Sequence, residues 1–160
     1  MKIILNHNQE KSDLIKAQIE DNDGYCCCAL KHTKDTKCMC TKFREAVAQG
    51  YIGECDCGLY RSIPSTIYLV GDTKFYKDFV YWNRYFSKEG VIVLAPINFP
   101  EKAKITQDES TNLNNVHIQK IHVADALFVI DRYGEITPTL AQDINMAKRL
   151  GKKIMYASQM

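Results

Sequence analysis

The placement of the cysteines constrains this 160-residue chain more than any other feature. All seven lie between Cys26 and Cys57, and they form three Cys-x-Cys pairs with Cys27 as the extra member of the first pair. So dense a group is typical of disulfide scaffolds and of metal-binding domains. The surrounding segment has few apolar residues from which to build a core, so we expect the cysteines to hold it together.

The expected compartment and the net charge limit the roles that these cysteines and this chain can have. The chain turns polar at Asn6 after a short apolar run, so we expect no secretory leader and a cytoplasmic protein. Cysteines in that compartment stay reduced, which favours metal binding or redox chemistry over structural disulfides. The longest apolar runs, such as 91–95, are far shorter than the ~20 residues needed to cross a bilayer. A net charge of +2 gives no electrostatic reason to expect DNA, RNA or a membrane as partner.

The residue pattern changes near Ile63-Pro64-Ser65, so we predict two modules, 1–62 and 66–160. The first is expected to hold two short helices, one over 11–22 and one that Thr41 caps and Gly50 ends. The second alternates apolar strands with amphipathic helices, and the expected strands are 66–70, 91–95, 126–130 and 153–156. The predicted fold class is therefore α/β, with a small helical module followed by a small doubly wound parallel-sheet domain.

The cysteine spacing leaves three chemistries open. Structural zinc sites favour Cys-x₂₋₄-Cys spacing, whereas this chain has Cys-x-Cys pairs. A [4Fe–4S] cluster takes four thiolates and would leave three cysteines for other work. A set of thiols without any metal is the third alternative. A dithiol beside a cluster would turn single electrons into two-electron disulfide chemistry.

The sequence around the pairs resembles the catalytic chain of ferredoxin–thioredoxin reductase over roughly residues 10–61. The segments that carry this resemblance are Asp23-Gly24-Tyr25-Cys26-Cys27-Cys28, Asp35-Thr36-Lys37-Cys38-Met39-Cys40 with Phe43-Arg44-Glu45, and Gly53-Glu54-Cys55-Asp56-Cys57-Gly58-Leu59-Tyr60. The resemblance implies a [4Fe–4S] cluster whose ligands are Cys26, Cys38, Cys40 and Cys55. It also implies ferredoxin as electron donor and a thioredoxin-like protein as disulfide target.

By the same resemblance, Cys28 and Cys57 would form a redox-active disulfide, with Cys28 attacking the target and Cys57 lying against the cluster. Two positions depart from the family, which commonly has proline where this chain has Cys27 and histidine where it has Asp56. A carboxylate at Asp56 is expected to raise the pKa of the nearby thiols and to slow their attack. Cys27 is an alternative cluster ligand or nucleophile.

The second module resembles the nucleoside 2-deoxyribosyltransferase-like superfamily over about residues 66–157. The segments that carry this resemblance are 66–72 with Phe75, 91–96, 117–125, 143–147 and 150–153. The resemblance implies a nucleotide or nucleoside site, which open parallel sheets place outside the carboxyl ends of their strands. The family's nucleophilic glutamate falls at Asp143, which is one methylene shorter.

Other polar residues sit where a ligand would be expected at the ends of the strands. The expected ligand contacts are Gly71, Asp72, Asp131 and Glu135. His117 and Lys120 lie three apart on a helix and face either the cleft or solvent. His122 is expected to be structural, and the apolar stripe from Phe75 to Phe86 is expected to be core. No glycine-rich dinucleotide or Walker motif supports NAD or ATP.

The leading hypothesis is an iron–sulfur disulfide reductase that passes ferredoxin electrons to a thioredoxin-like disulfide and carries an appended nucleotide- or nucleoside-binding domain. One alternative is a nucleoside deoxyribosyltransferase or N-glycoside hydrolase, with the cluster module structural or redox-sensing. The other is a non-enzymatic, metal-stabilised binding protein.

Overall fold

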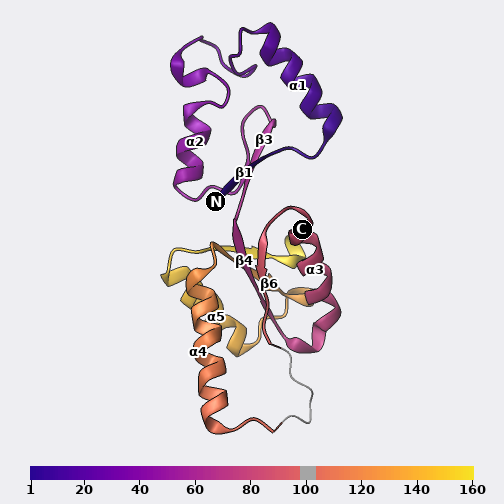
Figure 1. Ribbon diagram of the computed structural model, residues 1–160, viewed down its shortest axis with the longest axis vertical. Helices are drawn as coiled ribbons and strands as arrows, with labels where there is room; N and C mark the ends of the chain where they lie inside the picture. Colours follow the sequence, from indigo (N-terminus) through magenta and orange to yellow (C-terminus); the bar gives the residue numbers. More distant parts are fainter. Residues whose placement is uncertain (98–103) are drawn as a thin grey trace. The chain divides into compact units, whose positions relative to one another are not determined.

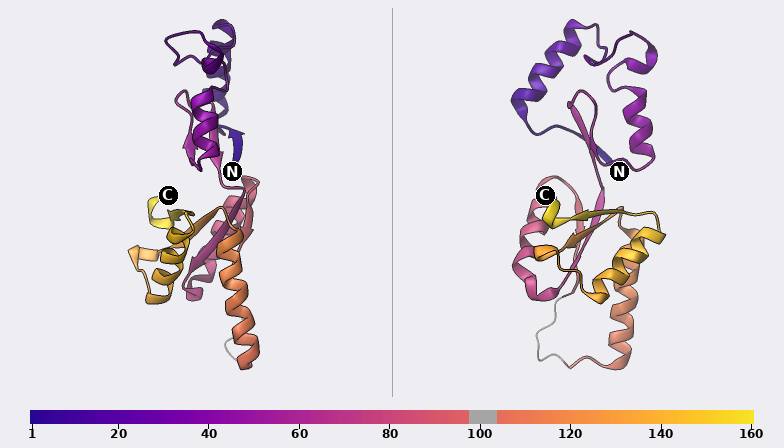
Figure 2. Two further views of the ribbon diagram at one scale, coloured as in Figure 1. Left: turned by 90° about the vertical axis from the view of Figure 1, so that its left-hand side faces the viewer. Right: turned by 180° about the vertical axis from the view of Figure 1, so that it is seen from behind.

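A computed structural model describes residues 1–97 and 104–160 of the chain. The chain divides into two compact units, Met1–Pro64 and Ser65–Met160, and each is described by itself (Figures 1 and 2). Within the described residues, no helix has the length and apolar content required to cross a membrane.

The N-terminal unit combines the two expected helices with a small sheet that the sequence pattern did not reveal. The helices are α1 (Gln9–Asp21) and α2 (Thr41–Ala48). The antiparallel sheet has the order β1-β3-β2, with bounds Lys2–Leu5, Tyr60–Ile63 and Gly53–Glu54. The prediction of a purely helical module was therefore incomplete. The central pairing joins Lys2 to Ile63, and such distant, short strands leave no local periodicity to detect.

Helix α2 begins one residue earlier than expected. Cys40 has extended backbone angles and is the N-cap, so Thr41 is the first helical residue and not the cap. The inward faces of the two helices meet in one apolar core. Its buried members are Ile15, Ile19, Phe43, Val47, Cys55 and Leu59. Two of the core contributors thus come from the last cysteine segment, which ties that segment to both helices.

The C-terminal unit is built on a four-stranded parallel sheet, as predicted. Its order is β5-β4-β6-β7, with bounds Ile92–Leu94, Thr66–Gly71, Ala126–Ile130 and Lys153–Tyr156. Every residue of β6 is buried, which explains its uninterrupted apolar sequence. Strand order reverses beside β4, because β5 lies on one side of it and β6 on the other. Ligands of open parallel sheets bind outside the carboxyl ends at such a point, here just beyond Gly71 and Ile130.

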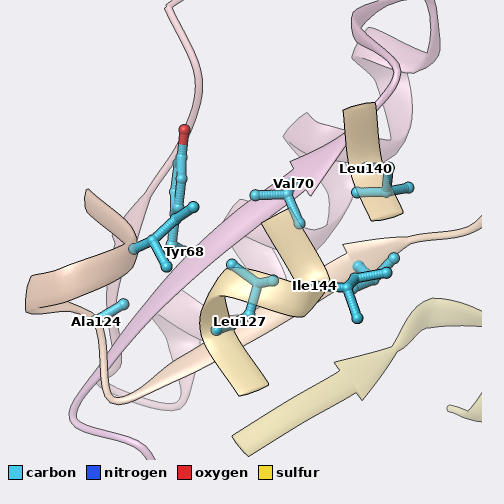
Figure 3. Close-up of a cluster of buried hydrophobic side chains, with 9 residues drawn as sticks. Tyr68, Val70, Ala124, Leu127, Leu140 and Ile144 are labelled. Atoms are coloured by element: carbon cyan, nitrogen blue, oxygen red, sulfur yellow. The ribbon is translucent and has the colours of Figure 1, made fainter. Parts of the chain in front are cut away.

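Helices flank this sheet, which confirms the coarse fold prediction. Helix α3 (Tyr76–Lys88) packs Phe86 and Trp82 against Phe128 of β6, so the predicted apolar stripe is core. Helices α4 (Gln107–Val123) and α5 (Pro138–Arg149) supply the partners of a second apolar cluster. Its buried members are Tyr68, Val70, Ile121, Ala124, Leu127, Val129, Leu140, Ile144 and Ala147, and six of them are labelled in Figure 3.

Candidate functional site

The second and third cysteine segments bring their thiols to the apolar core of the N-terminal unit. Cys55 is a buried member of that core, and Cys38, Cys40 and Cys57 pack against it while half-buried. Cys26 is also buried, whereas Cys27 and Cys28 are exposed. The four residues expected to hold a cluster are therefore all buried or half-buried, as is Cys57, and the expected attacking thiol Cys28 is accessible.

Backbone pairing holds the first two cysteine segments side by side. Tyr25 and Lys37 form an isolated antiparallel bridge. On either side of it, the Cys26 amide donates to the Thr36 carbonyl at 2.9 Å, and the Cys38 amide donates to the Gly24 carbonyl at 3.0 Å. The bridge fixes the spacing of the two backbones, so the side chains of Cys26 and Cys38 rise from neighbouring positions.

A tight turn presents the last cysteine segment. The Cys55 amide donates to the Tyr60 carbonyl at 2.9 Å, and the Gly58 amide donates to the Cys55 carbonyl at 2.8 Å. Gly58 has φ +77°, a left-handed conformation that glycine adopts without steric cost. The Tyr60 amide points inward and donates to Cys55 Sγ at 3.2 Å. Hydrogen bonds of this kind stabilise thiolate ligands and tune the potential of iron–sulfur clusters.

The short sulfur contacts lie within motifs. Cys26 Sγ is 3.0 Å from Cys28 Sγ, and Cys55 Sγ is 3.5 Å from Cys57 Sγ. All seven cysteines are free thiols in this structure, so the disulfide between Cys28 and Cys57 stays a prediction. In the first and last motifs, a buried sulfur is thus paired with a more accessible one.

Burial and the neighbouring sulfurs raise the pKa of three of these thiols, Cys28, Cys38 and Cys57. Partial burial, together with the neighbouring Cys26 sulfur, raises the pKa of Cys28 to about 12, and the charge of Asp56 adds to the same shift. Burial likewise raises the pKa of Cys38 to about 11 and that of Cys57 above its ordinary value. The direction expected for Asp56 is thus present, and a metal that binds here must displace protons.

Lys42 balances the charge of Asp56. Its Nζ lies 2.7 Å from Asp56 Oδ2, and this contact raises the pKa of Lys42. Both side chains are exposed, so the pair contributes little to stability. Its importance is local, because it places a cation beside the carboxylate that stands where the resembled family has histidine.

The candidate metal ligands are all thiolate sulfurs. Within residues 1–97 and 104–160, no three His, Cys, Asp or Glu side chains converge closely enough to hold one metal ion. A zinc site needs its ligands about 2.3 Å from a common centre. A [4Fe–4S] cluster binds each thiolate to a different iron and so takes ligands that stand farther apart. Cys26, Cys38, Cys40 and Cys55 supply the soft thiolates that such a cluster requires.

The C-terminal unit has a cavity at the carboxyl end of β4. Its volume is about 350 Å³, and it brings together three of the expected site residues, Gly71, Asp72 and Asp143. The remaining lining residues are Thr73, Thr137, Thr139 and Leu140. Gly71 is required by close packing, since a Cβ there would stand 3.0 Å from Ile130 Cβ and from the Ile130 carbonyl oxygen.

Two other expected ligand contacts lie elsewhere among the described residues. Asp131 is buried, and its carboxylate accepts hydrogen bonds from the Ser158 amide at 3.0 Å and the Ser158 hydroxyl at 2.6 Å. It therefore anchors the C-terminal turn. Glu135 is exposed and does not line the cavity.

The sequence did not predict that Tyr68, His117 and Asp143 form a hydrogen-bonded group. The Tyr68 hydroxyl lies 2.8 Å from His117 Nδ1, and His117 Nε2 lies 2.7 Å from Asp143 Oδ1. The ambiguity over His117 is thereby resolved, because its ring faces inward. Lys120 also turns toward the sheet, where its Nζ donates to the Ala95 carbonyl at 2.7 Å. In the sequence, Tyr68 looks like an ordinary strand residue. The fold brings its hydroxyl to His117, which lies 49 residues farther along the chain.

A larger cavity, of about 660 Å³, lies between α3 and the end of β5. Phe79, Val80 and Pro96 contribute to its apolar wall, and it contains none of the expected site residues. Its lining offers no cluster of carboxylates or thiols, so its size alone assigns it no chemistry.

Comparison of the chain with known proteins gives no information about these sites. A scan against protein-family models finds no match to the chain, and a search of curated proteins finds no significant match. The case for function therefore depends on the geometry above and on the motifs of the chain itself.

Proposed function

We propose that the N-terminal unit is an iron–sulfur disulfide reductase of the ferredoxin–thioredoxin reductase type. The observation that carries the proposal is the division of the cysteines by burial. Cys26, Cys38, Cys40 and Cys55 are buried or half-buried, and the last three belong to or pack against one apolar core, whereas Cys28 is exposed. A protein that must retain a cluster and still attack another protein's disulfide needs both kinds of cysteine.

The exchange chemistry needs only two of the thiols. Cys28, once deprotonated, attacks one sulfur of the target disulfide, forms a mixed disulfide and releases the other target sulfur as a thiolate. Cys57 then attacks the Cys28 sulfur, which releases the second target thiolate and leaves a Cys28–Cys57 disulfide. Two electrons pass from the protein to the target. A cluster held by the four inner cysteines would supply single electrons, from ferredoxin, to restore the dithiol with two protons from solvent.

The raised pKa of Cys28 makes proton removal a requirement of this scheme. The charge of Asp56 adds to this shift, and its carboxylate pairs with Lys42 at 2.7 Å. Attack should therefore be slow near neutral pH and faster as pH rises, since the thiolate is the nucleophile.

The test is reduction of a thioredoxin disulfide by anaerobically prepared full-length protein with reduced ferredoxin. Cys28→Ser and Cys57→Ser should each abolish turnover, because a serine hydroxyl cannot take part in disulfide exchange. Cys28→Ser should form no mixed disulfide, whereas Cys57→Ser should trap one that migrates at the combined mass. Cys27→Ser is the matched control and should retain activity. Full activity in Cys28→Ser, or loss only in Cys27→Ser, would show that the attacking thiol is misassigned.

For the C-terminal unit, we propose a nucleoside or nucleotide site at the cavity beyond β4. The supporting observation is that Asp72 and Asp143 share this cavity at the point where strand order reverses. Carboxylates there can accept hydrogen bonds from ribose hydroxyls. If the unit also cleaves nucleosides, the Asp143 carboxylate would attack the anomeric carbon as the bond to the base breaks, and water or another base would then release the sugar.

Calorimetric titration of the full-length protein with adenosine and 2′-deoxyadenosine tests this second proposal, with release of free adenine as the activity assay. Asp143→Ala should weaken binding by about tenfold or more, since one charged acceptor is lost. The exposed Asp108 of α4 supplies the control Asp108→Ala, which should bind as the wild type does. Absence of any binding would remove the nucleoside assignment and favour a purely structural role for this unit.

A further inference from the structure

Three polar side chains from separate elements form a continuous chain behind the cavity. Tyr68 comes from β4, His117 from α4 and Asp143 from α5. The two contacts of His117, at 2.8 Å to Tyr68 and 2.7 Å to Asp143, use both ring nitrogens. Tyr68 is 1% exposed and Asp143 is largely buried, whereas the His117 side chain is 31% exposed, so the protein shields the two ends of the chain more than its centre.

The acceptor at one end dictates the protons along the chain. An ionised carboxylate can only accept hydrogen bonds, so His117 Nε2 must carry the hydrogen that Asp143 Oδ1 receives. In the neutral ring, Nδ1 is then an acceptor, and the Tyr68 hydroxyl must donate to it. Burial, with the charge of Asp143, raises the pKa of Tyr68 and keeps that hydroxyl protonated.

We propose that His117 is a positioning residue, held in its Nε2-protonated tautomer by the Asp143 carboxylate and oriented by Tyr68, that fixes this carboxylate for a ligand in the cavity. The ligand part of this inference rests on the nucleoside site proposed above. Asp143 Oδ1 is committed to His117, whereas no hydrogen bond from the described residues engages Oδ2. Because Asp143 also lines the cavity, the free oxygen is the one available to a ribose hydroxyl or an anomeric carbon.

The surroundings support a fixed arrangement of the chain. Lys120, on the same helix as His117, lies 5.8 Å from the centre of the Tyr68 ring and donates to the Ala95 carbonyl. Its charge thus faces Tyr68, while Asp143 is the one carboxylate that contacts His117 among the described residues. The Tyr68 and His117 rings meet edge to face, with centroids 5.5 Å apart, which restricts rotation of the imidazole.

Long-range ¹H–¹⁵N NMR of the full-length protein tests the tautomer without any ligand. At neutral pH, His117 should show a protonated Nε2 and an unprotonated Nδ1, and Asp143→Ala, which removes the acceptor of the Nε2 hydrogen, should release it into tautomer exchange. His122, exposed on the same helix, provides an internal reference for an unrestrained ring. A protonated Nδ1 in the wild type, or the same averaged pattern for His117 and His122, would overturn the inference.

Calorimetric titration with adenosine then tests the positioning role. His117→Phe should weaken binding by about ten- to hundredfold, the usual effect of losing a hydrogen bond to a charged group. His117→Gln should recover most of this loss, because its amide can donate to Asp143 and accept from Tyr68. The control His122→Phe should bind normally. Circular dichroism of each variant establishes that it is folded.

The two arms separate the failure of this inference from that of the nucleoside site. If the wild type binds adenosine and His117→Phe binds equally well, His117 does not position Asp143 and the inference is wrong. If the wild type binds no adenosine, the proposed ligand class is wrong, and the tautomer measurement alone decides whether His117 is locked. A gain of binding in His117→Gln over His117→Phe supports positioning, since a space-filling role would not distinguish them in that direction.

Discussion

Truncation of Phe43 to alanine is a quantitative test of the N-terminal core. Phe43 is 4% exposed and packs in the core that contains Cys55. Truncating a buried phenylalanine costs about 3–5 kcal/mol. At roughly 0.05–0.15 kcal/mol per residue, a unit of the length of Met1–Pro64 has only about 3–10 kcal/mol of stability. The substitution should therefore remove much of the stability of this unit.

Two probes report the two units separately during urea unfolding. All seven cysteines lie in the N-terminal unit, so the reaction of buried Cys26 and Cys55 with a thiol reagent follows its unfolding. The single tryptophan, Trp82, packs 4.7 Å from Phe128 and reports the C-terminal unit by fluorescence. With a slope of about 1 kcal/mol per molar urea, Phe43→Ala should lower the thiol midpoint by about 3 M.

Phe79→Ala is the matched control, because Phe79 is 6% exposed in α3 and belongs to the C-terminal unit. It should lower the tryptophan midpoint and leave the thiol midpoint within error. Metal content must be equal in all samples, since a bound metal stabilises the folded form. An unchanged thiol midpoint in Phe43→Ala, or equal shifts of both probes in both variants, would refute the assignment of these side chains to separate cores.

Three further predictions concern single contacts. Lys11 lowers the pKa of Glu54 below its ordinary 4.5, and the pair is half-exposed. Glu54→Gln should therefore reduce the free energy of unfolding by under about 1 kcal/mol at pH 7, measured by urea unfolding. The difference from the wild type should vanish as pH falls through the lowered pKa of Glu54. Gly71→Ala should destabilise the C-terminal unit by about 1–3 kcal/mol, read by tryptophan fluorescence, because the new methyl group would press on Ile130; wild-type stability would contradict the packing. Asp125→Ala should cost about 2 kcal/mol by the same assay, because two backbone amides at the start of β4 lose their acceptor, and Asp125→Asn should cost less.

Local sequence patterns predicted the elements whose apolar residues recur with the period of a strand or a helix. The run 126–130 is apolar throughout because the strand is covered on both faces, so its bounds could be read directly. The helix that begins at Pro138 was equally legible, since proline suits the first turn and Gly151 follows the end with φ +66°. In both cases, the signal lies within the element itself.

Contacts between distant segments were not predictable in this way. Strand β1 pairs with β3 across nearly the whole N-terminal unit, and four residues give too short a pattern to identify a strand. The expected rim carboxylate Asp131 is engaged by Ser158, which lies 27 residues farther along the chain. The contacts of His117 likewise depend on how three elements pack. The residue types showed that these side chains could bind a ligand or take part in catalysis. Their hydrogen-bond partners became known only from the fold.

If Cys26, Cys38, Cys40 and Cys55 hold an iron–sulfur cluster, as we propose, metal analysis of the anaerobically purified chain should detect it. Iron, acid-labile sulfide and zinc should be measured on the wild type, on Cys38→Ser and on the control Cys27→Ser. With a cluster present, the wild-type chain should contain about four iron and four sulfide, the control should have the same content, and Cys38→Ser should lose most of it. One zinc per chain with no sulfide would contradict the proposal.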